Sequence, residues 1–263
     1  MLALAVTLPA RAELRLDGPM TQGGMIVGHA APGSAVTLDG TPVRVAPDGR
    51  FVFGFGRDAP PSARLEVIPP HGAAERRDLA VAPRTYDIQR IDGLPPAKVT
   101  PDPALDARLA RERAAVAAAR KHVSDAMFWA ETPAWPAKGR ISGVYGSQRI
   151  LNGQPRQPHY GVDVAGPKGS SVTAPGSGTV TLAEADFYYE GGIVIIDHGY
   201  GVSSTLIHLE RVDVKAGDQV VQGQQVGLLG AAGRASGPHV DWRMNWNGVR
   251  LDPALLAPPM PRP

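Results

Sequence analysis

Two pairs of histidine and aspartate, far apart along the chain, constrain its fold more than any other feature. His159 and Asp163 stand four positions apart, and much later His239 and Asp241 occupy alternate positions. Alternate residues of a strand point to the same face of a sheet, so the second pair can enter one cleft. Another histidine, His208, lies between the pairs in an apolar segment. Neutral imidazole together with carboxylate is typical of zinc sites that keep an open position for water.

The rest of the sequence predicts a mainly β protein. Among its 263 residues, 43% are hydrophobic, and 31 Gly and 26 Pro indicate many turns between short strands. Residues 13–83 alternate apolar and polar positions, with the turn signal Asp39-Gly40, so we expect a small β-sandwich there. Its short, evenly spaced strands resemble an immunoglobulin-like accessory module.

Two segments separate this sandwich from the histidine-rich part. Residues 84–101 are punctuated by proline and predict an extended linker. Residues 102–130 are rich in Ala, Arg, Glu and Lys and predict a long helix, either a strut packed on a domain or a coiled-coil partner surface. At the start, residues 1–12 are apolar and end in Ala10-Arg11-Ala12, which is typical of a partial signal peptide; the alternative is a hydrophobic first strand.

From about Gly139 to Gly248 the chain resembles the catalytic domain of the M23 (lysostaphin/LytM-type) zinc metallopeptidases. The first family motif, His-x-x-x-Asp, matches His159 and Asp163, and the middle histidine matches His208. The final His-x-His matches at His239 only, because Asp241 stands in the second position. The resemblance implies an antiparallel β core with a groove. The expected organisation is a partial signal peptide (1–12), sandwich (13–83), linker (84–101), helix (102–130), peptidase-like domain (138–250) and Pro-rich tail (251–263).

The resemblance also implies a role for each motif residue. His159, Asp163 and Asp241 are the expected metal ligands, while His208 and His239 are the expected catalytic residues that act on the attacking water or the oxyanion. The expected ion is Zn²⁺, although a second carboxylate favours Mn²⁺ or another divalent ion more than a second imidazole does. Two carboxylates also place two negative charges on the ion, which weakens it as a Lewis acid.

Two classes of function follow. The first is a metal-dependent endopeptidase that cuts peptide cross-links of peptidoglycan in the periplasm or outside the cell. The second is a degenerate LytM-domain protein that binds and activates a murein amidase or another divisome protein. A related phosphocarrier domain of sugar transport is a remote third, which the partial signal peptide disfavours. A net charge of +2 gives no nucleic-acid footprint, no cysteine is present for thiolate chemistry, and no stretch is apolar enough to span a membrane.

Overall fold

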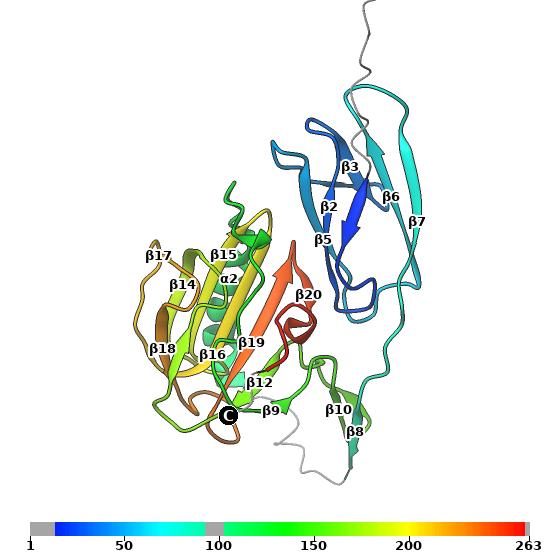
Figure 1. The fold of residues 1–263 in the computed structure, drawn as a ribbon. Coiled ribbons are helices and arrows are strands. Elements are labelled where there is room, and N and C mark those ends of the chain that lie inside the picture. Colours follow the sequence, from blue (N-terminus) through cyan, green and yellow to red (C-terminus); the bar gives the residue numbers. More distant parts are fainter. Residues whose placement is uncertain (1–13, 93–102, 261–263) are drawn as a thin grey trace, which may run out of the picture.

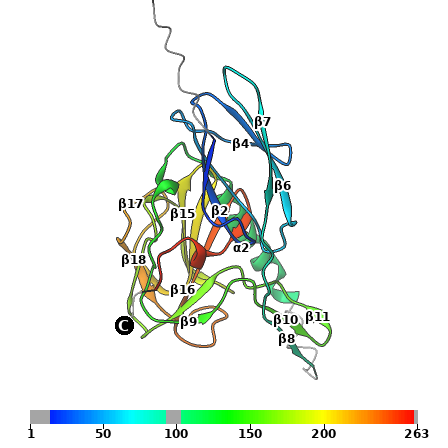
Figure 2. The same ribbon diagram turned by 45° about the vertical axis from the view of Figure 1, so that its right-hand side comes forward.

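The computed structural model describes residues 14–92 and 103–260 and shows a mainly β protein with antiparallel sheets (Figure 1). The expected signal peptide, residues 1–12, lies outside the described residues. Two small sheets lie above and to the right of a ten-stranded sheet in Figure 1. In Figure 2 one of them overlaps the ten-stranded sheet. Within the described ranges, no helix combines the length and the apolar character needed to cross a bilayer.

The N-terminal strands form one sheet ordered β1-β2-β5 and another ordered β4-β3-β6-β7. Buried residues alternate along β6, where Ala63, Leu65 and Val67 join the same core as Phe51. The predicted turn at Asp39-Gly40 is confirmed: the turn joins paired strands, and both residues have the positive φ values (47° and 77°) of a tight hairpin. The immunoglobulin-like topology stays a prediction. The strands are Arg15–Asp17 (β1), Met25–His29 (β2), Ala35–Leu38 (β3), Thr41–Val43 (β4), Arg50–Gly54 (β5), Ser62–Ile68 (β6) and Glu75–Ala80 (β7).

The segment expected to be a linker contains a strand. Ile88–Ile91 (β8) pairs in parallel with Gln148–Leu151 (β10), which in turn pairs with Gln154–Pro155 (β11). Isoleucine, which favours strands, begins and ends β8. Its partner strand is distant in sequence, so the local pattern does not reveal the pairing.

The helix is shorter than expected over 102–130. A 3₁₀ turn, Pro103–Leu105 (η1), leads into Asp106–Lys121 (α2), and Phe128–Ala130 (η2) is a separate 3₁₀ turn. The chain leaves the helix because its next residues bond to the sheet. The Ser124 N–H donates to Asp197 Oδ2 at 3.3 Å, and the Ser124 carbonyl accepts from the Tyr200 N–H at 3.1 Å.

The large sheet has the strand order β17-β14-β15-β16-β19-β12-β9, and β13, β18 and β20 pair off this path. Its central strands are buried on both faces, as expected for a sheet with layers on either side. The strands are Arg140–Gly143 (β9), Val162–Ala165 (β12), Ser171–Thr173 (β13), Gly178–Phe187 (β14), Gly191–Gly199 (β15), Val202–Val212 (β16), Gln219–Val220 (β17), Gln225–Leu229 (β18), His239–Trp246 (β19) and Val249–Leu251 (β20).

Helix α2 packs on one face of this sheet. Val194 and Leu206 join the main core on one side, whereas Ile195 and Ile207 form a second cluster with Ala119 of α2 on the other. In Figure 1 the helix lies behind β15 and β16. The expectation of a strut packed on a domain therefore holds for α2. The predicted site lies on this same face of the sheet.

Residues 251–255, in the segment expected to be a tail, pack against the rest of the protein. Leu251 is fully buried, and a Cβ on Gly54 of β5 would lie 2.5 Å from its Cδ2 atom. Asp252 forms an ion pair with Arg84 at 2.8 Å, and a final 3₁₀ turn follows at Pro253–Leu255 (η3). These contacts join the small sheets to the large one through a shared core. The Pro-rich segment expected to be a tail thus contributes to this junction.

Candidate metal centre

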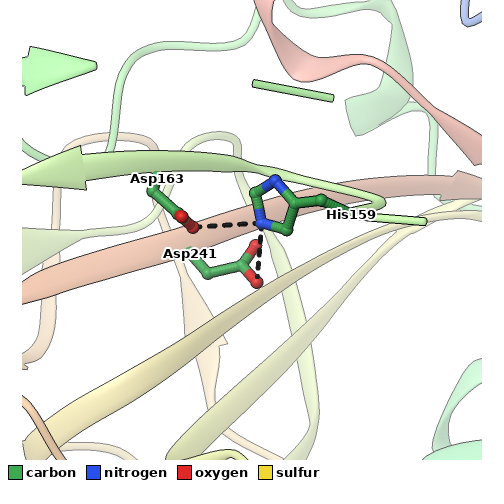
Figure 3. Close-up of side chains that lie close together, drawn as sticks. All are labelled: His159, Asp163 and Asp241. Atoms are coloured by element: carbon green, nitrogen blue, oxygen red, sulfur yellow. Dashed lines mark ion pairs between the residues drawn. The ribbon is translucent and has the colours of Figure 1, made fainter. Parts of the chain in front are cut away.

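Neighbouring strands bring the two histidine–aspartate pairs together. In the β12–β19 pairing, Asp163 stands directly opposite Asp241, and His159 lies just before β12 (Figure 3). His159 Nε2 lies 3.1 Å from Asp163 Oδ1 and 3.3 Å from Asp241 Oδ2. One ligand atom from each of the three residues lies within 4.8 Å of the others. All three predicted metal ligands therefore meet at one point.

This cluster fits a divalent cation. Two ligand atoms bound to one tetrahedral zinc ion lie about 3.3 Å apart, which matches both distances from His159 Nε2. Asp163 Oδ1 is buried and makes no well-aligned hydrogen bond, so this oxygen has unused acceptor capacity. His159 Nδ1 lies 3.2 Å from the Val144 carbonyl, which can only accept, so Nδ1 carries the proton and Nε2 faces the carboxylates.

Two glycines let the backbone approach these carboxylates closely. A Cβ on Gly161 would lie 2.1 Å from Asp241 Oδ1, and a Cβ on Gly143 would lie 2.2 Å from Asp163 Oδ2. Any larger residue would push the carboxylates away from His159. The Gly161 position sits inside the His159–Asp163 motif, so part of the spacing of that motif is set by this close approach.

Asp241 has a partner that the sequence patterns did not reveal. Arg243 Nη2 donates to Asp241 Oδ2 at 2.6 Å, and Arg243 Nε donates to the same carboxylate at 3.0 and 3.2 Å. Burial alone raises the pKa of Asp241, but the Arg243 charge and the His159 contact outweigh burial and hold that pKa well below its usual range. Asp241 is therefore ionised at neutral pH.

The Arg243 contact changes the expected charge of the site. Asp163 and Asp241 carry two negative charges, and the guanidinium of Arg243 offsets one of them. The net charge then equals that of one carboxylate with two neutral imidazoles. The expectation that a second carboxylate weakens a bound ion as a Lewis acid did not include this compensation and stays a prediction.

His159 is held as a cation when no metal competes for it. Burial lowers its pKa, but the nearby carboxylates of Asp163 and Asp241 more than reverse this effect and raise the pKa to about 10. A metal ion binds neutral imidazole, so binding here exchanges a proton for the metal.

An irregularity in β16 turns His208 toward the site. Leu206 and Leu209 both join the main core although they are three residues apart, so one extra residue is accommodated between them. His208 takes up this irregularity with a φ of 67°, a region rarely occupied without glycine. Its ring centroid lies 4.7 Å from that of His239. The sequence predicted His208 in this strand but not the strained backbone that aims it.

Both predicted catalytic imidazoles keep one ring nitrogen available. His208 Nδ1 lies 2.9 Å from the Ala232 carbonyl and His239 Nδ1 lies 2.8 Å from the Gly237 carbonyl, so each Nδ1 donates and each neutral Nε2 keeps a lone pair. His239 Nε2 lies 3.7 Å from Asp163 Oδ1, at the edge of the metal cluster. Burial lowers the pKa of His208, which favours its neutral, proton-accepting form at neutral pH.

His198, Tyr188 and Tyr189 make contacts that serve the fold. His198 is 3% exposed and its ring nitrogens lie 2.7 Å from the Ser177 carbonyl and 2.9 Å from Ser204 Oγ. It is a hydrogen-bonding residue of the core. Tyr188 and Tyr189 pack edge to face, with ring centroids 5.0 Å apart.

Comparison with known proteins agrees with this geometry. Residues 157–253 match the model of Peptidase family M23. The crystal structure of a Pseudomonas aeruginosa protein described as an M23 peptidase superimposes with a TM-score of 0.66 and 30% identity, covering 90% of this chain and 93% of that one. The chain belongs to peptidase family M23.

Relatives of the chain include endopeptidases. The chain is 36% identical over 109 residues to the peptidoglycan DD-endopeptidase ShyA of Vibrio cholerae, a match that covers 41% of this chain and 25% of ShyA. It is 34% identical over 103 residues to the DD-carboxypeptidase/endopeptidase Mpg of Neisseria meningitidis, covering 39% of this chain and 24% of Mpg. The matches thus span about a quarter of the length of these relatives.

Proposed function

We propose that this protein is a metal-dependent endopeptidase that cleaves peptide cross-links of peptidoglycan in the periplasm or outside the cell. The observation that carries the proposal is the convergence of His159, Asp163 and Asp241 on one point beside the paired imidazoles of His208 and His239. The peptidoglycan endopeptidases among the M23 relatives support the substrate class.

In this proposal each residue has a defined task. His159 Nε2, Asp163 Oδ1 and Asp241 Oδ2 hold a divalent ion, with zinc the best match to the donor set and manganese an alternative. When bound, the ion supplies a Lewis acid that polarises the scissile carbonyl and acidifies water. Neutral His208 accepts a proton from the attacking water and later returns it to the leaving amine. His239 Nε2, which keeps a lone pair beside Asp163, holds the attacking water and helps to deprotonate it.

Metal content and wall digestion test the proposal together. Protein purified without chelator should contain one zinc per chain by elemental analysis and should release muropeptides from purified walls. His159→Ala should lose the metal, whereas His208→Ala should keep it and lose roughly 10²–10³ in rate. His71→Ala, at an exposed histidine, is the matched control and should change neither. Wild type that binds neither zinc nor manganese contradicts the proposal.

One observation favours a second candidate, the degenerate domain that activates a murein amidase. Arg243 already occupies Asp241 with three close contacts and competes with any ion for that carboxylate. This alternative predicts no stoichiometric metal, no muropeptide release by the protein alone, and faster wall digestion when an amidase is added. Metal bound through Asp241 together with cleavage in the absence of amidase would exclude it.

A further inference from the structure

Beyond Asp241, strand β19 continues with a cluster of donors on the same sheet face. Arg243 and Asn245 are the next alternate residues, so both side chains share the face of Asp241. Arg250 of β20 pairs with Asn245, and its Nη1 donates to Asn245 Oδ1 at 2.6 Å. Two guanidinium groups therefore flank a buried amide next to the metal centre.

Helix α2 adds a third guanidinium from outside the segment matched by the family model. Arg120 Nη2 donates to Thr205 Oγ1 at 3.2 Å, and Thr205 stands opposite Arg243 in the β16–β19 pairing. Burial first, and then the charges of Arg250 and Arg243, lower the pKa of Arg120 to about 9. Burial, followed by the charge of Arg243, lowers the pKa of Arg250 to about 10. All three remain protonated at neutral pH and repel one another.

Two buried donors of the cluster lack acceptors. Arg120 Nε and Asn245 Nδ2 are inaccessible to solvent, and neither finds a hydrogen-bond partner in the described part of the chain. Asn245 as a whole is 1% exposed. The carboxylates of Asp241, which Arg243 engages, and of Glu190 offset only part of the positive charge: burial and the neighbouring arginines still lower the pKa of Arg120, and burial and Arg243 that of Arg250. Buried donors without acceptors beside three like charges indicate a site completed by an anionic ligand.

We propose that Arg120, Arg243, Arg250 and Asn245 bind a free carboxylate of the peptide substrate. The proposal rests on the endopeptidase function and names the feature of the substrate that the enzyme selects. Guanidinium groups match the planar carboxylate, which is the anionic group that a peptide carries. Arg243 and Asn245 lie about 7 and about 13 Å along the strand from Asp241, so the carboxylate lies about two to four extended residues from the bond at the metal centre.

Three forms of one cross-linked muropeptide test this inference: unmodified, amidated at the chain terminus, and amidated at the side-chain carboxylate. Affinity is measured calorimetrically on chelator-treated protein, which does not turn over, and kcat/KM is measured on the zinc-loaded protein. We expect one of the two amidated forms to bind and react roughly 10- to 100-fold less well, which identifies the carboxylate that is recognised.

Arg120→Gln should weaken binding and cleavage of the unmodified peptide by the same factor and remove the discrimination between the three peptide forms. Arg120→Lys should restore part of this discrimination. Arg250→Gln is a second, independent variant in case the first perturbs the fold, which thermal unfolding monitors. The matched control is Arg111→Gln, an equal charge change at an exposed position of the same helix, and it should behave like wild type.

The outcomes separate the two proposals. Cleavage of all three forms at equal rates, or equal effects of Arg120→Gln and Arg111→Gln, overturns the carboxylate site while the endopeptidase function stands. Selective binding without cleavage overturns the endopeptidase function while the carboxylate site stands. Absence of both binding and cleavage overturns both.

Discussion

The pairing of Arg243 with Asp241 leads to a measurable coupling between stability and metal content. The Asp241 side chain is 3% exposed and that of Arg243 is 24% exposed. Removing the guanidinium leaves a buried carboxylate without its closest counter-charge in the metal-free protein. Loss of one partner of a fully buried pair costs about 3–5 kcal/mol, and exposed pairs contribute less than about 1 kcal/mol. For this partly exposed pair we expect Arg243→Gln to cost about 2–3 kcal/mol.

Bound metal should offset much of this loss, because the ion replaces the missing positive charge beside Asp241. A cost of about 2–3 kcal/mol lowers the melting temperature of a protein of this size by about 5–10 °C. We expect that decrease in chelator-treated Arg243→Gln and less than half of it in the zinc-loaded protein. Differential scanning calorimetry of both forms provides the comparison, and zinc titration should show tighter binding in the variant.

A matched pair elsewhere in the chain controls for loss of an arginine. Arg211 contacts Asp213 with the same two-residue spacing at 2.5 Å, but its side chain is 58% exposed. Arg211→Gln should therefore cost less than about 1 kcal/mol, with or without zinc. The assignment of Arg243 as the counter-charge of Asp241 is wrong if Arg243→Gln lowers the stability no more than this control does. It is also wrong if the loss of stability is the same with and without zinc.

Further predictions concern the site and the core. Asp241→His alone should weaken zinc binding, because it leaves Arg243 unpaired, and Asp241→His with Arg243→Met should restore it; equal affinities would refute the charge argument. Gly161→Ala should lose metal, whereas Gly56→Ala, with no atom closer than 3.5 Å to a Cβ, should not. Burial lowers the pKa of His198, so the unfolded chain binds more protons than the folded chain below pH 6.5. The free energy of unfolding, measured by urea titration, should therefore fall by up to about 1.4 kcal/mol per pH unit below pH 6.5. His198→Gln should flatten this slope.

The sequence predicted the parts of this fold that depend on local patterns. Strand alternation and turn residues indicated a mainly β chain, and the alternate positions of His239 and Asp241 placed both side chains on one face. The pairing of Asp163 with Asp241 confirms that this face meets the first motif. Long-range pairings such as β8 with β10 were not predicted, because nothing in a strand's own residues specifies a distant partner. The helix was predicted to end nine residues too late, because its composition stays helix-compatible while tertiary bonds at Ser124 end it.

At the site too, the sequence pattern did not reveal how single residues pair in three dimensions. Compared with the family motif alone, Asp241 is a loss of imidazole and a gain of negative charge. In three dimensions the substitution is paired with Arg243, whose stem passes Gly161 so closely that a Cβ there would lie 2.7 Å from Arg243 Cγ. Glycine, aspartate and arginine therefore form one unit that keeps the charge of the site while changing its ligand chemistry. The charge of the same arginine acts on Arg120 and Arg250, so the residue that compensates Asp241 also connects the metal centre to the proposed carboxylate site.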